Sequence, residues 1–222
     1  MNIELLLFLG IIFLLLISQI WISVTYKKYS NTDASLPMTG KDIVENMLKI
    51  NGINDVYLGT TKGNLDDHYN SKIKKINLSK NSCTTNSIAA IAVAAHETGH
   101  AVQDHENYFM LKIRKLLGPI TVICSKFIWI AIFIGILLQF FELIVLGLVF
   151  MGVTVLFQVI TLPVEFDASR RAVKYLSTVG YDEYTMSGIK KMLKAAAFTY
   201  IASTIASLLQ LIRLVLSFTR ND

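Results

Sequence analysis

The alternation of long apolar runs with polar segments is the clearest pattern in the chain. Four apolar runs cover about residues 5–24, 118–140, 143–164 and 195–218. Each is close to the ~20 helical residues that cross a hydrocarbon layer of ~30 Å. The pattern predicts a mainly α, multi-pass membrane protein with about four transmembrane helices. Almost no loop separates the second run from the third, so we expect an antiparallel hairpin that turns at 139–142.

Two polar segments, 27–115 and 165–194, lie between the spans, and we expect them to form a small α+β region. In chain order, the pattern predicts a helix capped by Thr39 and ending before Asn51-Gly52, a strand at 56–58, a turn-rich loop over 63–71, a strand at 75–78, and a helix from about Thr85 into residues 96–100. We interpret residues 1–222 as a single membrane domain, and we find no internal repeat in the chain.

Basic residues gather near the ends of the apolar runs, as at Lys27, Lys28, Lys190 and Lys191. The chain has a mean hydropathy of +0.51 and a net charge of +5. A basic balance can indicate nucleic-acid binding, but clusters at the ends of spans indicate membrane orientation. We therefore expect a lipid bilayer and no nucleic acid as partner. The positive-inside rule places both polar segments in the cytoplasm of a cell-membrane protein.

The strongest chemical signal is the sequence His96-Glu97-Thr98-Gly99-His100. On a helix, residues four apart lie only ~40° from each other around the axis, so both imidazoles face one point. Two neutral imidazoles suit Zn²⁺. Glu97 is then placed to act as the general base that takes a proton from a zinc-bound water. The motif predicts a zinc metallopeptidase that hydrolyses peptide bonds with zinc-activated water.

A catalytic zinc needs a third protein ligand and an open position for water. His105 follows His100 by five residues, about 140° further round the helix, so we interpret it as a solvated side chain. Glu165 follows the proline of Leu162-Pro163 at the cytoplasmic end of the third run, and we predict that it is the third ligand. Asp167 is the alternative carboxylate. A capping role at the membrane surface also stays open for Glu165.

Three stretches carry a resemblance to a known family: Gly63-x-Leu65-x-Asp67-His68-Tyr69, residues 87–103 around the histidine motif, and Leu162-Pro163-Val164-Glu165-Phe166-Asp167-Ala168-Ser169. They resemble the YugP-type neutral zinc metallopeptidases of bacterial membranes over essentially the whole chain, and more distantly the HtpX and CAAX-prenyl-type membrane proteases. The resemblance implies that His96, His100 and Glu165 bind zinc, with the motif glutamate as base and the site on the cytoplasmic side. The HtpX-type pattern has a helper Asp four residues after the ligand Glu; here that position is Ser169, and the Asp is Asp167.

Two further roles are hypotheses. His68 or Tyr69 could stabilise the oxyanion that forms during peptide hydrolysis, and the alternative is that both hold a turn. By resemblance to gluzincin-like folds, the strand near Ile76 would pair with substrate backbone as an edge strand.

Three functions compete at this point. The first is a gluzincin-like zinc peptidase with Zn²⁺ as cofactor, acting on membrane or membrane-proximal polypeptides. The second is a non-catalytic membrane scaffold in which zinc is only a structural staple. An intramembrane site-2-type protease is less favoured, because the helix before His96 follows a polar segment directly and no second Asp-bearing membrane motif of that family is present.

Overall fold

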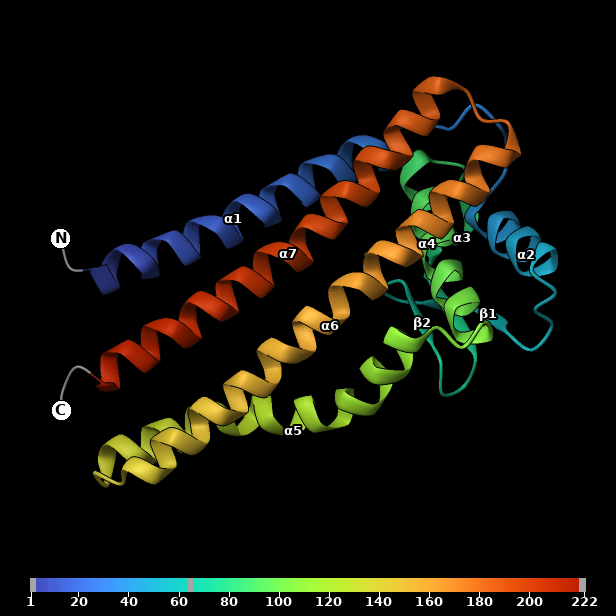
Figure 1. Cartoon of the computed structure of the whole chain (residues 1–222). Helices are drawn as coiled ribbons and strands as arrows, with labels where there is room; N and C mark the ends of the chain where they lie inside the picture. The colour runs from blue at the N-terminus through green and yellow to red at the C-terminus, as the bar shows by residue number, and fades with distance from the viewer. Residues whose placement is uncertain (1–2, 64–65, 220–222) are drawn as a thin grey trace. The chain divides into compact units, whose positions relative to one another are not determined.

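Figure 1 shows the computed structural model, which describes residues 3–63 and 66–219. Its contacts divide the chain into two compact units. The apolar unit consists of Met1–Gln19, Lys112–Pro163 and Phe198–Asp222, and the polar unit of Ile20–Leu111 and Val164–Ala197. Each is described by itself below. Leu65, one of the residues on which the resemblance rests, lies outside the described residues.

Four long helices supply the apolar unit: α1 (Ile3–Ser30), α5 (Phe109–Leu137), α6 (Phe141–Val179) and α7 (Glu183–Thr219). Each is long and apolar enough to cross a membrane, which confirms the prediction of a mainly α, multi-pass membrane protein. Each helix also continues beyond the apolar run that predicted it on at least one side. α6 is the clearest case, since it passes through Pro163 and ends only at Val179.

The turn between α5 and α6 lies at residues 138–140, slightly before the predicted 139–142. Gln139 adopts a left-handed backbone with φ 54°, and the Phe140 N–H bonds back to the Gly135 carbonyl. Glu142, which was expected in the turn, instead lies in the first turn of α6. A carboxylate is favoured there by the positive end of the helix dipole.

Small residues let α5 and α6 approach closely inside the apolar unit. A Cβ added at Gly147 would lie 2.5 Å from Ile132 Cγ1, so only glycine fits without a shift. Ile128 and Ile132 of α5 pack on Met151 of α6, with partly buried side chains of α7 around them. Most other large apolar side chains of this unit are exposed, as is expected of surfaces that lipid covers.

The polar unit is built around α4 (Ile88–His105), the helix that carries the histidine motif. The other elements are α2 (Gly40–Ile50), β1 (Tyr57–Thr61), β2 (His68–Asn70), β3 (Lys75–Ser79), α3 (Lys80–Thr84), and the adjoining ends of α1, α6 and α7. Buried apolar side chains from these elements form one core that includes Ile43, Ile76, Ile91, Leu176 and Ile189. The predicted α+β region is therefore present.

Several local predictions for the polar unit are confirmed. Thr39 caps α2 and forms a reciprocal capping box with Asp42, which satisfies backbone groups at the helix start. The strands predicted at 56–58 and 75–78 correspond to β1 and β3. The motif helix begins at Ile88 rather than near Thr85, because the Ser87 side chain accepts a hydrogen bond from the Ala90 N–H and so takes the N-cap position.

The sheet corrects two expectations. Its order is β1-β3-β2, with β1 parallel and β2 antiparallel to β3. The strand near Ile76 is thus the central strand, and the prediction that it is an edge strand was wrong. His68 and Tyr69, expected in a loop, form β2 at one edge. Three residues are too short to reveal a strand period in sequence, and pairing with β3 creates this strand.

Close packing within the polar unit brings α6 against α4. A Cβ added at Gly99 would lie 2.7 Å from the Ala168 backbone oxygen, a distance that side chains do not tolerate. The glycine inside the motif therefore allows the part of α6 that begins at Val164 to lie directly on the motif helix. This contact determines which α6 side chains reach the two histidines.

Candidate metal centre

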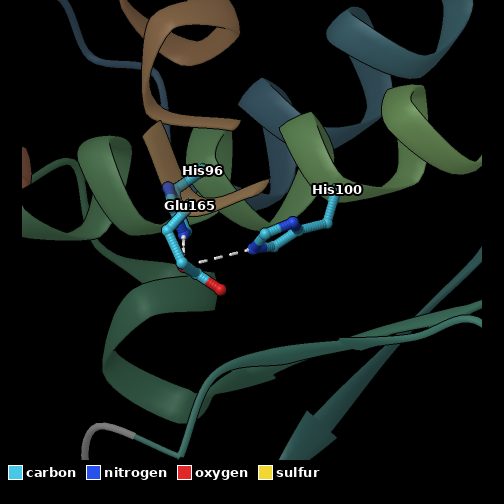
Figure 2. Close-up of side chains that lie close together, drawn as sticks. All are labelled: His96, His100 and Glu165. Carbon is cyan, nitrogen blue, oxygen red and sulfur yellow. Dashed lines mark hydrogen bonds and ion pairs between the residues drawn. The ribbon is translucent and has the colours of Figure 1, made fainter. Parts of the chain in front are cut away.

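Figure 2 shows three side chains from two helices pointing toward one another. His96 and His100 lie one turn apart on α4, with ring centroids 4.8 Å apart and planes at 81°. Glu165 comes from α6 and is only 1% exposed. Its Oε2 lies 3.2 Å from His96 Nε2 and 3.6 Å from His100 Nε2. Among the described residues, these three form the group of side chains that could hold a metal ion.

The surroundings of Glu165 exclude the role of a helix cap. The residue lies inside the 39-residue helix α6, far from either end, so it meets no unsatisfied helix terminus. A buried carboxylate is costly unless it has partners of opposite charge or a metal. The Nε2 atoms of both histidines contact it from the facing helix. The position is explained by the histidines and not by the membrane surface.

The outer nitrogens of the two imidazoles also have partners. His96 Nδ1 lies 3.2 Å from Ser169 Oγ on α6, and His100 Nδ1 lies 3.0 Å from Gln103 Oε1 on α4. Each Nδ1 is thus engaged on the side away from Glu165, while each Nε2 faces it. Contacts of this kind orient metal-binding histidines in proteins.

Comparisons of the whole chain with known proteins agree with this chemistry. A family described as "Putative neutral zinc metallopeptidase" matches residues 4–219. The chain belongs to this family. A protein of Bacillus subtilis (strain 168) named "Putative membrane protease YugP" is 38% identical over 202 residues, which cover 90% of each chain. No solved structure gives a significant match. The resemblance to YugP-type zinc metallopeptidases is confirmed.

The zinc implied by this family can be tested against the three side chains. For tetrahedral Zn²⁺ with bonds of about 2.1 Å, ligand atoms lie about 3.4 Å apart. The distances of 3.2 and 3.6 Å from Glu165 Oε2 to the two Nε2 atoms bracket that value. All the candidate ligand atoms lie within 4.8 Å of one another. Two imidazoles and one carboxylate are also a donor set that zinc prefers, so the residues fit the ion.

Glu97, the predicted base of the zinc metallopeptidase motif, is held by the edge strand. Its Oε2 accepts a hydrogen bond of 2.8 Å from the backbone N–H of Tyr69 in β2. Burial raises the pKa of Glu97 to about 7, while the neighbouring His96 lowers it. A bound divalent cation would also favour the carboxylate form.

The other residues singled out in the sequence lie away from the three candidate ligands. Tyr69 directs its hydroxyl to Asp104 Oδ2, 2.8 Å away on α4. His68 is exposed, and its ring nitrogens contact the Asp66 carbonyl and the Asn77 amide. His105 is exposed at the end of α4, as predicted. In this arrangement the oxyanion roles suggested for His68 and Tyr69 have no contact to support them.

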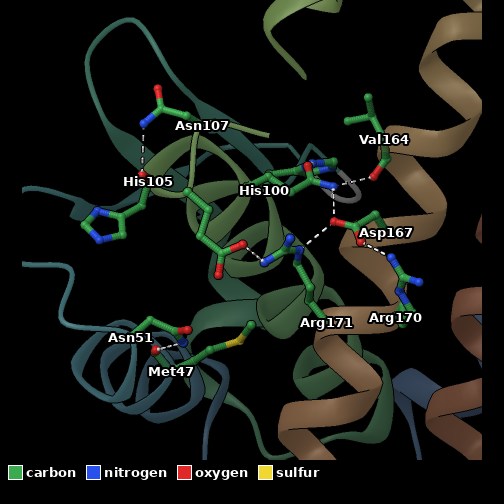
Figure 3. A network of polar contacts seen from close by, with 11 residues as sticks. Met47, Asn51, His100, His105, Asn107, Val164, Asp167, Arg170 and Arg171 are labelled. Carbon is green, nitrogen blue, oxygen red and sulfur yellow. Dashed lines mark hydrogen bonds and ion pairs between the residues drawn. The ribbon is translucent and has the colours of Figure 1, made fainter. Parts of the chain in front are cut away.

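Asp167, the alternative third ligand, also faces away from the three side chains. Its carboxylate accepts hydrogen bonds from Gln103, Arg170 and Arg171 (Figure 3). Sequence reasoning missed Gln103 altogether. One signal was available: on a helix, a residue three positions after His100 lies on the same side, and a glutamine there among small apolar residues needs a partner.

Proposed function

We propose that the protein is a zinc peptidase that hydrolyses peptide bonds in membrane or membrane-proximal polypeptides. His96, His100 and Glu165 would be the metal ligands and Glu97 the general base. One observation carries the proposal: a fully buried glutamate from a second helix lies within ligand distance of both histidines of the motif. Such a carboxylate has little other reason to lie in this core.

The bound zinc would supply Lewis-acid polarisation of the substrate carbonyl and activation of water at neutral pH. The side chains do the rest. His96 and His100 present their Nε2 atoms, and Glu165 presents Oε2. Glu97 Oε2 is fixed by the Tyr69 N–H, so the carboxylate has a defined orientation for proton transfer through Oε1. Tyr69 is the middle residue of β2, an edge strand, so Glu97 lies beside a sheet edge that an extended polypeptide could approach.

The site is proposed to face the cytoplasm. Lys112, Arg114 and Lys115 adjoin the second apolar run, and Lys190 and Lys191 precede the fourth. With four spans, all of these residues fall on the same side as the histidine motif. The positive-inside rule assigns that side to the cytoplasm. Cysteine accessibility in oriented membranes tests the assignment: a cysteine replacing exposed His105 should react only from the cytoplasmic side.

Zinc content tests the ligands. Wild-type protein in detergent should contain close to one zinc per chain by elemental analysis, and Glu165→Ala should lose most of it. Glu142→Ala is the matched control, because this exposed glutamate lies in the first turn of α6, inside the apolar unit. No zinc in the wild type after reconstitution, or full zinc in Glu165→Ala, would contradict the ligand set.

Glu97→Gln tests catalysis separately from binding. The variant should retain zinc and lose cleavage of an unfolded polypeptide such as casein by at least ~100-fold, the usual size of a general-base contribution. If the wild type binds zinc but Glu97→Gln and wild type behave alike in every assay, the zinc would be a structural staple of a scaffold and the peptidase assignment would fail.

A further inference from the structure

A chain of polar contacts extends behind His100, away from the candidate metal position. Gln103 is fully buried in the polar unit, with 0% of its surface exposed. Its Oε1 contacts His100 Nδ1 at 3.0 Å. Its Nε2 donates to the Val164 backbone oxygen at 2.8 Å and to Asp167 Oδ2 at 3.0 Å. Two of these three contacts join the motif helix to α6, and the third, to His100, lies within α4 (Figure 3).

The charged end of this chain determines the direction of every hydrogen bond in it. Arg170 and Arg171 carry only donors, and both donate to Asp167, which is almost fully buried. Asp167 is thereby held as a carboxylate, which can only accept. Arg171 also donates to Oε2 of Glu106, 2.6 Å away. Glu106 is the residue that caps the end of α4.

The orientation of the Gln103 amide then determines which nitrogen of His100 carries the proton. A carboxylate and a backbone carbonyl can both only accept, so Gln103 must direct its NH₂ group toward Asp167 and Val164. Its carbonyl oxygen is left facing His100 Nδ1, and that nitrogen must carry the proton. In neutral imidazole the other nitrogen then holds a lone pair. For His100, that nitrogen is Nε2, the one that faces Glu165.

We propose that Gln103, oriented by Asp167, is a positioning residue that fixes His100 in the Nδ1–H tautomer and so prepares its Nε2 for metal. The part concerning metal rests on the proposed function, and the tautomer does not. His96 differs, because its Nδ1 contacts the Ser169 hydroxyl, which can either donate or accept. On the Nδ1 side, only His100 has its proton fixed by its partner. His96 is constrained at Nε2 instead, because that atom lies 3.2 Å from the Glu165 carboxylate, which can only accept.

The tautomer can be measured in metal-free protein. The chain has four histidines, so ¹⁵N-histidine labelling in detergent micelles gives few signals, assigned with His→Gln variants. Long-range ¹H–¹⁵N spectra distinguish a protonated Nδ1 from a protonated Nε2. We expect the Nδ1–H form for His100 in the wild type and a mixture in Gln103→Leu. Wild-type His100 in the Nε2–H form would overturn the proposal without any variant.

Zinc affinity gives the second readout. Gln103→Leu should bind zinc about 10–100-fold more weakly in competition with a chelator, the usual effect of losing such a partner. Gln19→Leu makes the same chemical change at an exposed position in the apolar unit and should bind like the wild type. Equal affinity of Gln103→Leu and the wild type would overturn the proposal while leaving the zinc site intact.

A swap of donor and acceptor distinguishes positioning from simple packing. Gln103→Glu alone puts two carboxylates together and should weaken zinc binding. Adding Asp167→Asn supplies an NH₂ donor to the new carboxylate and should restore part of the affinity and the Nδ1–H signal of His100. If the double variant binds zinc no more tightly than Gln103→Glu, the proposed orientation of His100 by Asp167 through Gln103 would be contradicted. If the wild type binds no zinc but His100 is in the Nδ1–H form, the orientation of His100 by Gln103 is supported and the proposed function fails.

Discussion

The two units of this protein use apolar residues in opposite ways. In the apolar unit, large side chains of α5 such as Phe133 and Ile130 are mostly exposed, and a small cluster around Ile128 and Ile132 is its buried centre. In the polar unit, a continuous core includes many side chains with no exposed surface, such as Ile43 and Ile91. Lipid replaces protein contacts for the first unit, while the second must supply its own.

The difference teaches where particular residues matter. The exposed helix faces of the apolar unit need only length and hydropathy, so many sequences would serve. The polar unit depends on specific neighbours, as at Gly99 against Ala168 and at Gln103 between two helices. The chain also carries one buried cysteine in each unit, Cys83 in the polar unit and Cys124 in the apolar unit. The rate at which each thiol reacts with a labelling reagent therefore reports the opening of its own unit.

The largest effect is expected for Ile91→Ala. Ile91 lies on α4 with 0% exposure, and truncation of such a side chain costs about 2–5 kcal/mol because a cavity remains. Since 1.4 kcal/mol is tenfold in an equilibrium, Cys83 should react about 30-fold faster or more under conditions of rapid reclosing. Labelling of Cys124 should stay near the wild-type rate, because the substitution opens the polar unit and leaves the apolar unit unchanged.

Ile50→Ala is the control within the same unit, because Ile50 is 71% exposed at the end of α2. It should leave Cys83 labelling within about threefold of the wild-type rate, since exposed substitutions are usually worth less than about 0.5 kcal/mol. If Ile50→Ala and Ile91→Ala accelerate Cys83 labelling equally, the polar unit is not organised around the buried face of α4.

The second effect, in order of size, is expected for Gly99→Leu. The added side chain must meet the Ala168 backbone 2.7 Å from its Cβ, so α4 and α6 must separate, at a cost of about 1–3 kcal/mol. Separation also moves Glu165 away from the histidines. We expect loss of most bound zinc, measured by elemental analysis, together with faster Cys83 labelling.

Gly152→Leu is the matched control, since nothing lies within 4 Å of a Cβ added at that position of α6. It should retain zinc fully. Retention of zinc by Gly99→Leu would mean that the approach of the two helices at this glycine is not what brings Glu165 to the motif.

A smaller effect is expected for Tyr69→Phe. The Tyr69 hydroxyl ties β2 to Asp104 on α4, while its backbone N–H holds Glu97. Loss of the hydroxyl removes one hydrogen bond, worth about 1 kcal/mol, and loosens the strand that orients Glu97, the proposed base. Zinc content should be unchanged, and kcat should fall several-fold with little change in KM. Tyr57→Phe, at an exposed position of β1, is the control. A wild-type kcat in Tyr69→Phe would show that the hydrogen bond from Tyr69 to Asp104 does not contribute to catalysis.

Much of this organisation could be predicted from the sequence, and the successes share a physical reason. Spans follow from length and hydropathy, the α2 start follows from the Thr39 capping box, and the motif follows from helical periodicity. All three depend on residues that are near one another in the chain. Glu165 was within reach as a candidate because few carboxylates adjoin a span on the side of the motif, although its metal-binding role stays a prediction.

The failures depend on distant contacts instead. β2 exists because residues 68–70 pair with β3, and the central place of Ile76 is a property of the whole sheet. α6 continues through Pro163, although proline often ends or kinks a helix, and the turn that follows packs closely on α4 at Gly99. The role of Gln103 depends on Asp167, 64 positions away in the chain. Such distant pairs leave no signal in the local periodicity or in the helix caps.

The smallest effect is expected for Ile130→Ala in α5. Ile130 is 51% exposed in the apolar unit, so its truncation leaves no cavity. The substitution weakens membrane insertion of the span by about 0.5 kcal/mol, which is small for a helix of this length and composition. Labelling of Cys124 and of Cys83 should both match the wild type, and zinc should be retained. A marked acceleration at Cys124 would show that this face of α5 is packed against protein in the membrane, such as a second copy of the chain, and the contrast between a lipid-solvated unit and a self-packed one would then be too simple.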